Sequence, residues 1–93
     1  MVTLEDMKKY LRVDGSDEDD LITSLIESAE QYIENTTGKP NDGSALYLLC
    51  EKIFVAHWYE NRGVVGEETE LPQAGQALLT HIKLSDAYPE AAS

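Results

Sequence analysis

The chain has 93 residues, with 18 acidic side chains against 7 basic ones and a formal net charge of −11. This length predicts a single domain. A chain this acidic is not suited to binding nucleic acid through its phosphates, because that requires clustered Lys and Arg. For the same reason it is not suited to binding anionic membrane surfaces.

The first predicted helix covers residues 3–12. Thr3 can cap its start, and Asp6 stands where a reciprocal capping partner is expected. A helix of this length is not stable alone in water, so it must dock on the rest of the chain. Its docking stripe consists of Leu4, Met7, Tyr10 and Leu11.

The second predicted helix covers residues 18–37, after an acidic cluster at 16–20. The cluster does not fit a calcium loop, because Leu25 stands where a bidentate glutamate is required. We interpret it as helix initiation with Ser16 or Asp17 as the cap, and Gly38 as the stop. One continuous apolar face is predicted, made of Leu21, Ile22, Leu25, Ile26, Ala29, Tyr32 and Ile33.

The third predicted helix, residues 44–62, is apolar on almost every side, unlike an ordinary surface helix with one stripe and a polar back. Asp42 or Ser44 can cap it, and it should pack antiparallel to the second helix because the connection is short. One stripe is predicted from Leu46, Leu49, Cys50, Ile53 and Trp58, and a second from Ala45, Leu48, Ala56 and Tyr59. Such a helix must be covered by the rest of the chain, by another chain, or by both.

The remaining chain predicts a loop or short hairpin at 63–71 and a fourth helix at 72–84. The buried side of that helix is predicted from Leu71, Ala74, Gly75, Leu78 and Ile82, with Leu79 off the stripe. The whole is expected to be an all-α bundle of about four helices, with residues 1–88 as one domain and 89–93 as a frayed tail. Neither a signal peptide nor a membrane span is evident, so we expect a soluble intracellular protein.

No catalytic, metal or cofactor site is predicted. His57 and Glu60 could share one helix face, but two ligands on one helix do not make a metal site. Cys50, the only cysteine, lies on an apolar stripe beside Glu51 and is interpreted as a buried small hydrophobe. The sequence therefore indicates a protein that is not an enzyme.

An interface is predicted around Trp58, Tyr59 and Arg62, because these residue types are enriched where proteins bind one another. Trp58 and Tyr59 are adjacent, so they point roughly 100° apart on a helix. One small domain cannot easily bury both, and the residues alone leave open whether they only close the core or also meet another subunit.

Four motifs follow one another along the chain. They are LEDMKKYLRVDGSDEDD at 4–20, LITSLIESAEQYIENTTG at 21–38, AHWYENR at 56–62 and ELP at 70–72. In this order they resemble the tailed-phage head–tail connector family, found in phages and prophages. The resemblance spans residues 4–84, nearly the whole chain.

The resemblance implies a mostly helical protomer with no catalytic residues and no cofactor. It implies a homo-oligomeric ring, typically dodecameric, that docks beneath the portal protein in the virion after assembly in the host cytoplasm. Such a ring extends the DNA channel, lets DNA pass without specific binding, and receives the next head-completion or tail protein once DNA packaging is complete. On this basis we expect Trp58, Tyr59, Arg62, Val64 and Val65 to contribute to the ring interface or to portal docking.

Two other interpretations remain open from the residues. One is a DNA-mimic inhibitor, whose acidic face would bind a basic enzyme. The other is a small helical regulatory or scaffolding dimer, which would not grow beyond two subunits. Assembly state separates both from a connector.

Overall fold

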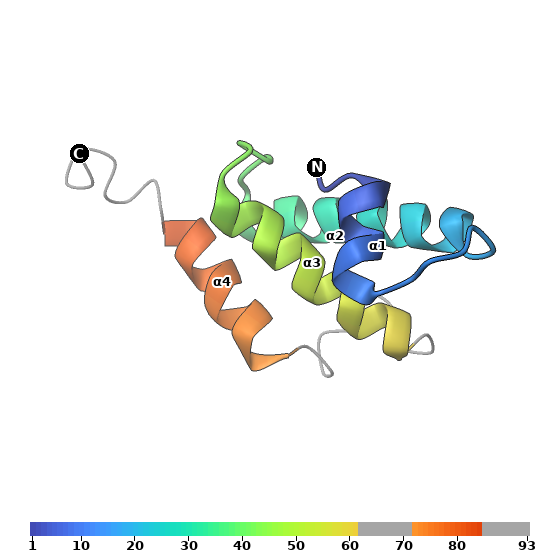
Figure 1. Ribbon diagram of the computed structural model, residues 1–93. Helices are drawn as coiled ribbons and strands as arrows, with labels where there is room; N and C mark the ends of the chain where they lie inside the picture. The colour runs from blue at the N-terminus through green and yellow to red at the C-terminus, as the bar shows by residue number, and fades with distance from the viewer. Residues whose placement is uncertain (62–71, 85–93) are drawn as a thin grey trace.

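The computed structural model describes residues 1–61 and 72–84. Within those ranges the chain forms four helices and no strand: α1 (Leu4–Leu11), α2 (Asp19–Thr37), α3 (Ala45–Glu60) and α4 (Gln73–Leu84) (Figure 1). The predicted all-α bundle is confirmed. The predicted loop or hairpin at 63–71 and the predicted tail at 89–93 lie outside the described residues.

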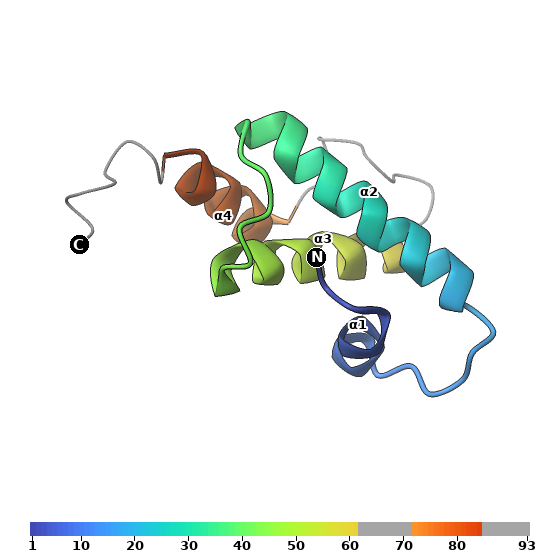
Figure 2. The same cartoon turned by 90° about the horizontal axis from the view of Figure 1, so that it is seen from above.

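Helices α2 and α3 form the central pair of the described bundle, because each packs against the other and against both α1 and α4. Helices α2 and α3 run in roughly opposite directions, as the short connection predicts (Figure 2). Helices α1 and α4 contact α3 on either side of it (Figure 1).

The side of α3 that the fold buries differs from the predicted stripe. The structure leaves Leu46 40% and Leu49 41% exposed and buries a neighbouring stripe instead. Apolar side chains surround this helix, so spacing alone cannot identify the face that turns inward. The buried positions are Tyr47, Cys50, Glu51, Phe54, Val55 and Trp58.

Three aromatic rings make the middle of the core where α2 meets α3. Trp58 stacks on Phe54 with ring centroids 5.8 Å apart and planes at 15°. Tyr32 of α2 meets both rings edge-on, at 5.6 Å from Phe54 and 5.9 Å from Trp58. These are the offset and perpendicular arrangements that aromatic quadrupoles favour. The cluster fixes how α2 crosses the C-terminal half of α3.

The helix termini confirm most of the predicted caps. The Thr3 hydroxyl accepts a hydrogen bond from the Asp6 N–H, and the Ser44 hydroxyl accepts one from the Tyr47 N–H. Gly38 ends α2 in the left-handed region at φ 76°. The prediction for the start of α2 is wrong: its N-cap is Glu18, which makes no side-chain capping bond.

Helix α4 reaches α3 through Gly75, whose backbone lies against the Phe54 ring. Gly75, Leu79 and Ile82 are the buried positions of this helix, whereas Ala74 is exposed. The prediction that Leu79 lies off the buried stripe and Ala74 on it is therefore wrong. Leu71 lies outside the described residues. Gly75 and Ile82 are buried as predicted.

Replacing Gly75 with alanine tests this close approach. An added Cβ would lie 2.5 Å from Cε1 of Phe54, whose stacked ring has little room to move. Overpacking costs about 1–3 kcal/mol, and the better helix propensity of alanine returns about 1 kcal/mol. We expect Gly75→Ala to lower the free energy of unfolding by about 1 kcal/mol, measured by urea denaturation.

Gly15→Ala is the matched control, because a Cβ at Gly15 meets nothing within 4 Å. The control should leave stability unchanged within about 0.5 kcal/mol. Equal stability of the two variants would contradict tight packing between α4 and Phe54.

Candidate functional site

The most unusual surface of the protein is an exposed apolar stripe on α3, which we call the outer face of α3. It consists of Leu46, Leu49, Ile53 and Ala56. Leu46 and Leu49 are among the few large apolar side chains that the described residues expose, while Ile53 and Ala56 are half-buried. Contiguous exposed apolar surface on a small protein marks an interaction site more often than an accident of sequence.

Two neighbouring helices bound the outer face of α3. On one edge, Tyr10 of α1 lies under the ammonium group of Lys52, which is 5.9 Å from the ring centroid. On the other edge, Leu46 lines a surface hollow together with His81 and Ile82 of α4. The face is thus an open strip of α3 between α1 and α4, with a cation at its α1 edge.

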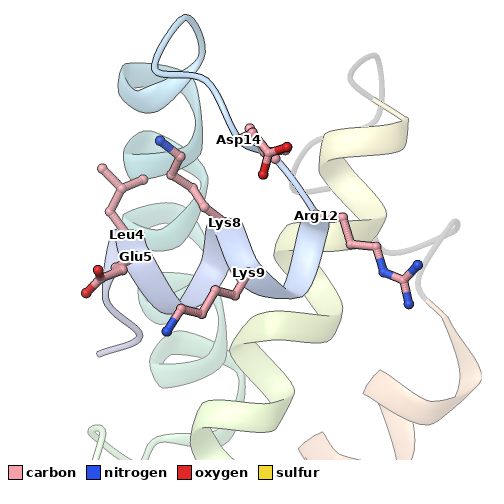
Figure 3. A pocket seen from close by; sticks show the side chains of 7 residues that line it. Leu4, Glu5, Lys8, Lys9, Arg12 and Asp14 are labelled. Atoms are coloured by element: carbon pink, nitrogen blue, oxygen red, sulfur yellow. The ribbon is translucent and has the colours of Figure 1, made fainter.

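Positive charge is concentrated around α1. Four of the six Lys and Arg residues that the structure describes lie on or against this helix: Lys8, Lys9, Arg12 and Lys52. The α1 residues among them line a hollow of about 580 Å³ together with Leu4, Glu5, Val13 and Asp14 (Figure 3). Lys8 pairs with Asp19 at 2.7 Å, whereas Arg12 extends from the end of α1 toward the side where α3 lies (Figure 3).

The exposed back of α2 carries the opposite charge. Asp20, Glu27 and Glu34 are exposed along this helix, and no Lys or Arg occurs in it. The described surface is thus strongly acidic along α2 and locally basic beside α1 and α3. This separation gives the protomer two electrostatically different sides.

A fully buried carboxyl group, Glu51, joins three segments of the fold. Its Oε1 accepts a hydrogen bond from the Val2 N–H at 2.9 Å, and its carboxyl group hydrogen-bonds that of Glu30 on α2. The Asn41 amide donates to Glu30 at 2.8 Å and to Glu51 at 3.4 Å. Burial, followed by the bond to Glu30, raises the pKa of Glu51 to about 7. The bond from Glu51 lowers the pKa of Glu30.

This carboxyl pair links segments of the fold. Glu51 has no exposed surface, whereas the Glu30 side chain is partly exposed. The pair ties the start of the chain and the loop before α3 to the α2–α3 pair. No sequence pattern predicts this pair, because Glu51 is a single polar residue within an apolar helix.

The structure places the predicted interface residues in different environments. Trp58 is fully buried, and Tyr59 is half-buried with its hydroxyl donating to the Glu18 carboxylate. The fold buries Trp58 completely but Tyr59 only partly, so the question whether Tyr59 also meets another subunit stays open. Arg62, Val64 and Val65 lie outside the described residues. The described part of the chain brings Trp58 and Tyr59 to one end of α3 but directs them to different neighbours.

The other candidate residues do not assemble into a reactive site. Cys50 is buried with its sulfur 3.9 Å from the Gly75 carbonyl oxygen, and burial raises the pKa of its thiol to about 12. In the described ranges no group of His, Cys, Asp and Glu is arranged to hold a metal ion. No helix of the described chain is long and apolar enough to cross a membrane.

Sequence reasoning did not identify which side of α3 is exposed. Leu46 and Leu49 belong to a predicted apolar stripe, and the residues alone left open whether this chain, another chain or both cover it. One feature of the sequence could have indicated it: α3 has more apolar residues than one buried stripe contains.

Comparison with known proteins gives one finding. The family model described as phage gp6-like head-tail connector protein matches residues 1–83. No curated protein and no solved structure gives a significant match.

Proposed function

The chain belongs to the phage gp6-like head–tail connector family, and we propose on that premise that it forms a closed ring of identical subunits beneath the portal protein. As a member of this family it is a structural component of the phage particle. In the proposed ring, about twelve subunits extend the DNA channel below the portal and present a surface to the next head-completion or tail protein.

The observation that carries the proposed ring is the outer face of α3. The chain's own core is complete without Leu46 and Leu49, which stay 40% and 41% exposed. Burying an exposed leucine stabilises an assembly by roughly 25 cal/mol per Å² of apolar surface. In a closed ring built from heterologous contacts, every subunit has two neighbours. The outer face of α3 would then be covered in every subunit.

The charge distribution supports passage of DNA without binding. Asp20, Glu27 and Glu34 lie exposed along α2, and the whole chain carries a net charge of −11. We propose that acidic helix backs face the channel, where they repel the phosphates of the moving duplex. The basic cluster beside α1 is then turned away from DNA and toward protein.

We further propose that the C-terminal end of α3 and the residues after it belong to the subunit contact. Tyr59 offers a half-buried ring there, and Trp58 supports it from inside the core. Arg62, Val64 and Val65 follow in the sequence and supply a cation and two apolar side chains. Interfaces between proteins are enriched in Tyr, Trp and Arg.

Native mass spectrometry tests the ring, with the chain measured alone over a range of concentrations and then with its cognate portal protein. We expect a closed species of about a dozen subunits, alone or on the portal. Val64→Ala/Val65→Ala should lower the fraction of this species while the helical circular dichroism stays unchanged. A monomer or dimer that also ignores the portal would refute the ring and favour a regulatory dimer or a DNA mimic.

A further inference from the structure

We propose that the Glu30–Glu51 carboxyl pair is a pH-sensitive latch for the start of the chain, residues 1–11. The latch holds this part closed while the pair carries a proton and releases it when the proton is lost. The released part consists of the segment before α1 and α1 itself, whereas the other three helices stay packed. The latch belongs to the single protomer and does not depend on the proposed ring.

The geometry of the pair favours a shared proton. The amide nitrogen Nδ2 of Asn41 donates to Oε1 of Glu30 at 2.8 Å and to Oε2 of Glu51 at 3.4 Å, so the two carboxyl groups lie side by side. Glu51 has no exposed surface. Two adjacent carboxylates, one of them out of contact with water, cannot both be ionised without a large cost in free energy. One proton held between them removes this cost, and the pKa of Glu51, raised to about 7 by burial and by Glu30, agrees with it.

The groups that act on the Glu51 carboxyl are few in the described chain. They are Glu30 of α2, the Val2 N–H and the Met1 amino group. No lysine or arginine is among them, and the Met1 amino group lies 3.8 Å from Oε1 of Glu30. Tyr47 and Cys50 share the helix of Glu51, and burial raises the pKa of both side chains, so both stay neutral near neutral pH. The buried charge in this cluster is therefore set by whether the pair holds its proton.

The latch acts on the start of the chain through a direct hydrogen bond. The Val2 N–H donates to Oε1 of Glu51 at 2.9 Å, and Val2 is itself buried. This bond favours the charged carboxylate, but burial and Glu30 outweigh it, as the raised pKa of Glu51 shows. A carboxylate that has lost its proton is stabilised by water. The motion favoured at high pH is therefore one that moves Val2 away and lets water reach Glu51.

Helix α1 is the element that can separate with the least loss of packing. Helices α2, α3 and α4 all pack against one another, and α2 and α3 contain the aromatic cluster of the core. Helix α1 has eight residues and packs mainly on α2 and α3 at the edge of the bundle (Figure 2). Met7 is its buried residue, and Lys8 pairs with Asp19 at 2.7 Å. Local opening of such an edge element costs less than global unfolding.

Hydrogen exchange measured by mass spectrometry at pH 6 and pH 8 tests the latch, after correction for the intrinsic pH dependence of exchange. With a pKa of about 7 in the closed state and the ordinary 4.5 in the open state, opening of residues 1–11 should become about ten-fold more frequent between these pH values. At pH 8 the amides of α1 should exchange about ten-fold faster, or more, than those around Phe54 in α3. Glu51→Gln should remove the change with pH, because its amide carries no titrating proton.

Glu60→Gln is the matched control, because Glu60 is an exposed glutamate of the same helix. It should keep the ten-fold change of the wild type. Both variants retain the Met1 amino group, so its titration contributes equally to all three proteins. Equal protection of the amides of α1 and of those around Phe54 would mean that only global unfolding occurs, and would overturn the latch. Opening of wild-type α1 that does not depend on pH would overturn it too, as would a ten-fold change that persists in Glu51→Gln.

Discussion

Trp58→Ala is expected to lower the free energy of unfolding by about 3–5 kcal/mol, the largest effect of any substitution considered for this protein. Trp58 has no exposed surface and contacts the rings of Phe54 and Tyr32 at centroid distances of 5.8 and 5.9 Å. Removing the indole leaves a cavity that the surrounding helices can only partly fill. A domain of this size is stable by about 5–15 kcal/mol in total, so the variant should be close to unfolding at 37 °C.

Urea denaturation followed by far-UV circular dichroism measures this loss, because Trp58 is the only tryptophan and its fluorescence disappears in the variant. Trp58→Phe is the matched control and should retain most of the stability, since a smaller ring still stacks on Phe54. Within the described residues the Trp58 Nε1 has no hydrogen-bond partner, so the control loses no bond of that kind. A loss below about 1 kcal/mol for Trp58→Ala would show that the core does not depend on this ring.

The second large effect is that the stability of the wild-type protein depends on pH. Glu51→Gln is expected to remove this dependence. The pKa of Glu51 is raised from its ordinary 4.5 to about 7, first by burial and then by the bond to Glu30. The folded protein thus holds a proton at pH values where the unfolded chain has released it. The stabilisation from this proton is complete below the ordinary pKa and is lost as pH rises through about 7.

We expect wild-type stability to fall by about 2 kcal/mol between pH 5 and 7, because each unit of pKa shift corresponds to about 1.4 kcal/mol. The Glu51→Gln amide keeps an acceptor for the Val2 N–H and a donor toward Glu30, as a protonated carboxyl does. Its stability should therefore stay level over this range. Chemical denaturation at half-unit pH intervals measures both curves.

Glu27→Gln is the control for this experiment, because Glu27 is exposed on α2. It should preserve the wild-type slope. Glu30 contributes the opposite pH dependence of stability. The bond from Glu51 lowers the pKa of Glu30, so its stabilisation is lost as the pH falls below its ordinary pKa. Measurements above about pH 5 therefore isolate Glu51. Parallel curves for the wild type and Glu51→Gln would refute the assignment.

Helix α3 has two separate tasks in this protein. One side carries Phe54 and Trp58 and holds the other three helices together. The other side carries Leu46 and Leu49 and serves assembly in the proposed ring. Trp58→Ala should weaken folding and assembly together, whereas Leu49→Cys should leave folding unchanged. This separation allows assembly to be altered without losing the protomer.

The helices, most of their caps and the family can be predicted from the amino-acid sequence alone. Amphipathic spacing identifies α2, Thr3 and Ser44 begin their helices as predicted, and the motifs from LRVD to HWYENR point to the connector family whose model matches residues 1–83. These features depend on residues close together along the chain. Local backbone preferences and hydrogen bonds are sufficient to encode them.

The side of α3 that turns inward and the way α4 packs on it could not be predicted from the sequence, because both depend on packing between helices. An all-round apolar helix has no polar back to mark its surface, so the competition between Leu49 and Phe54 for the core was settled by packing against α2. In α4, Gly75 lies against the Phe54 ring, and Leu79 is buried on the same side of that helix. The burial of Glu51 depended on Glu30, Asn41 and Val2 coming together. Such arrangements depend on shape complementarity between segments that are distant in sequence. The periodicity of residues within one segment does not predict this complementarity.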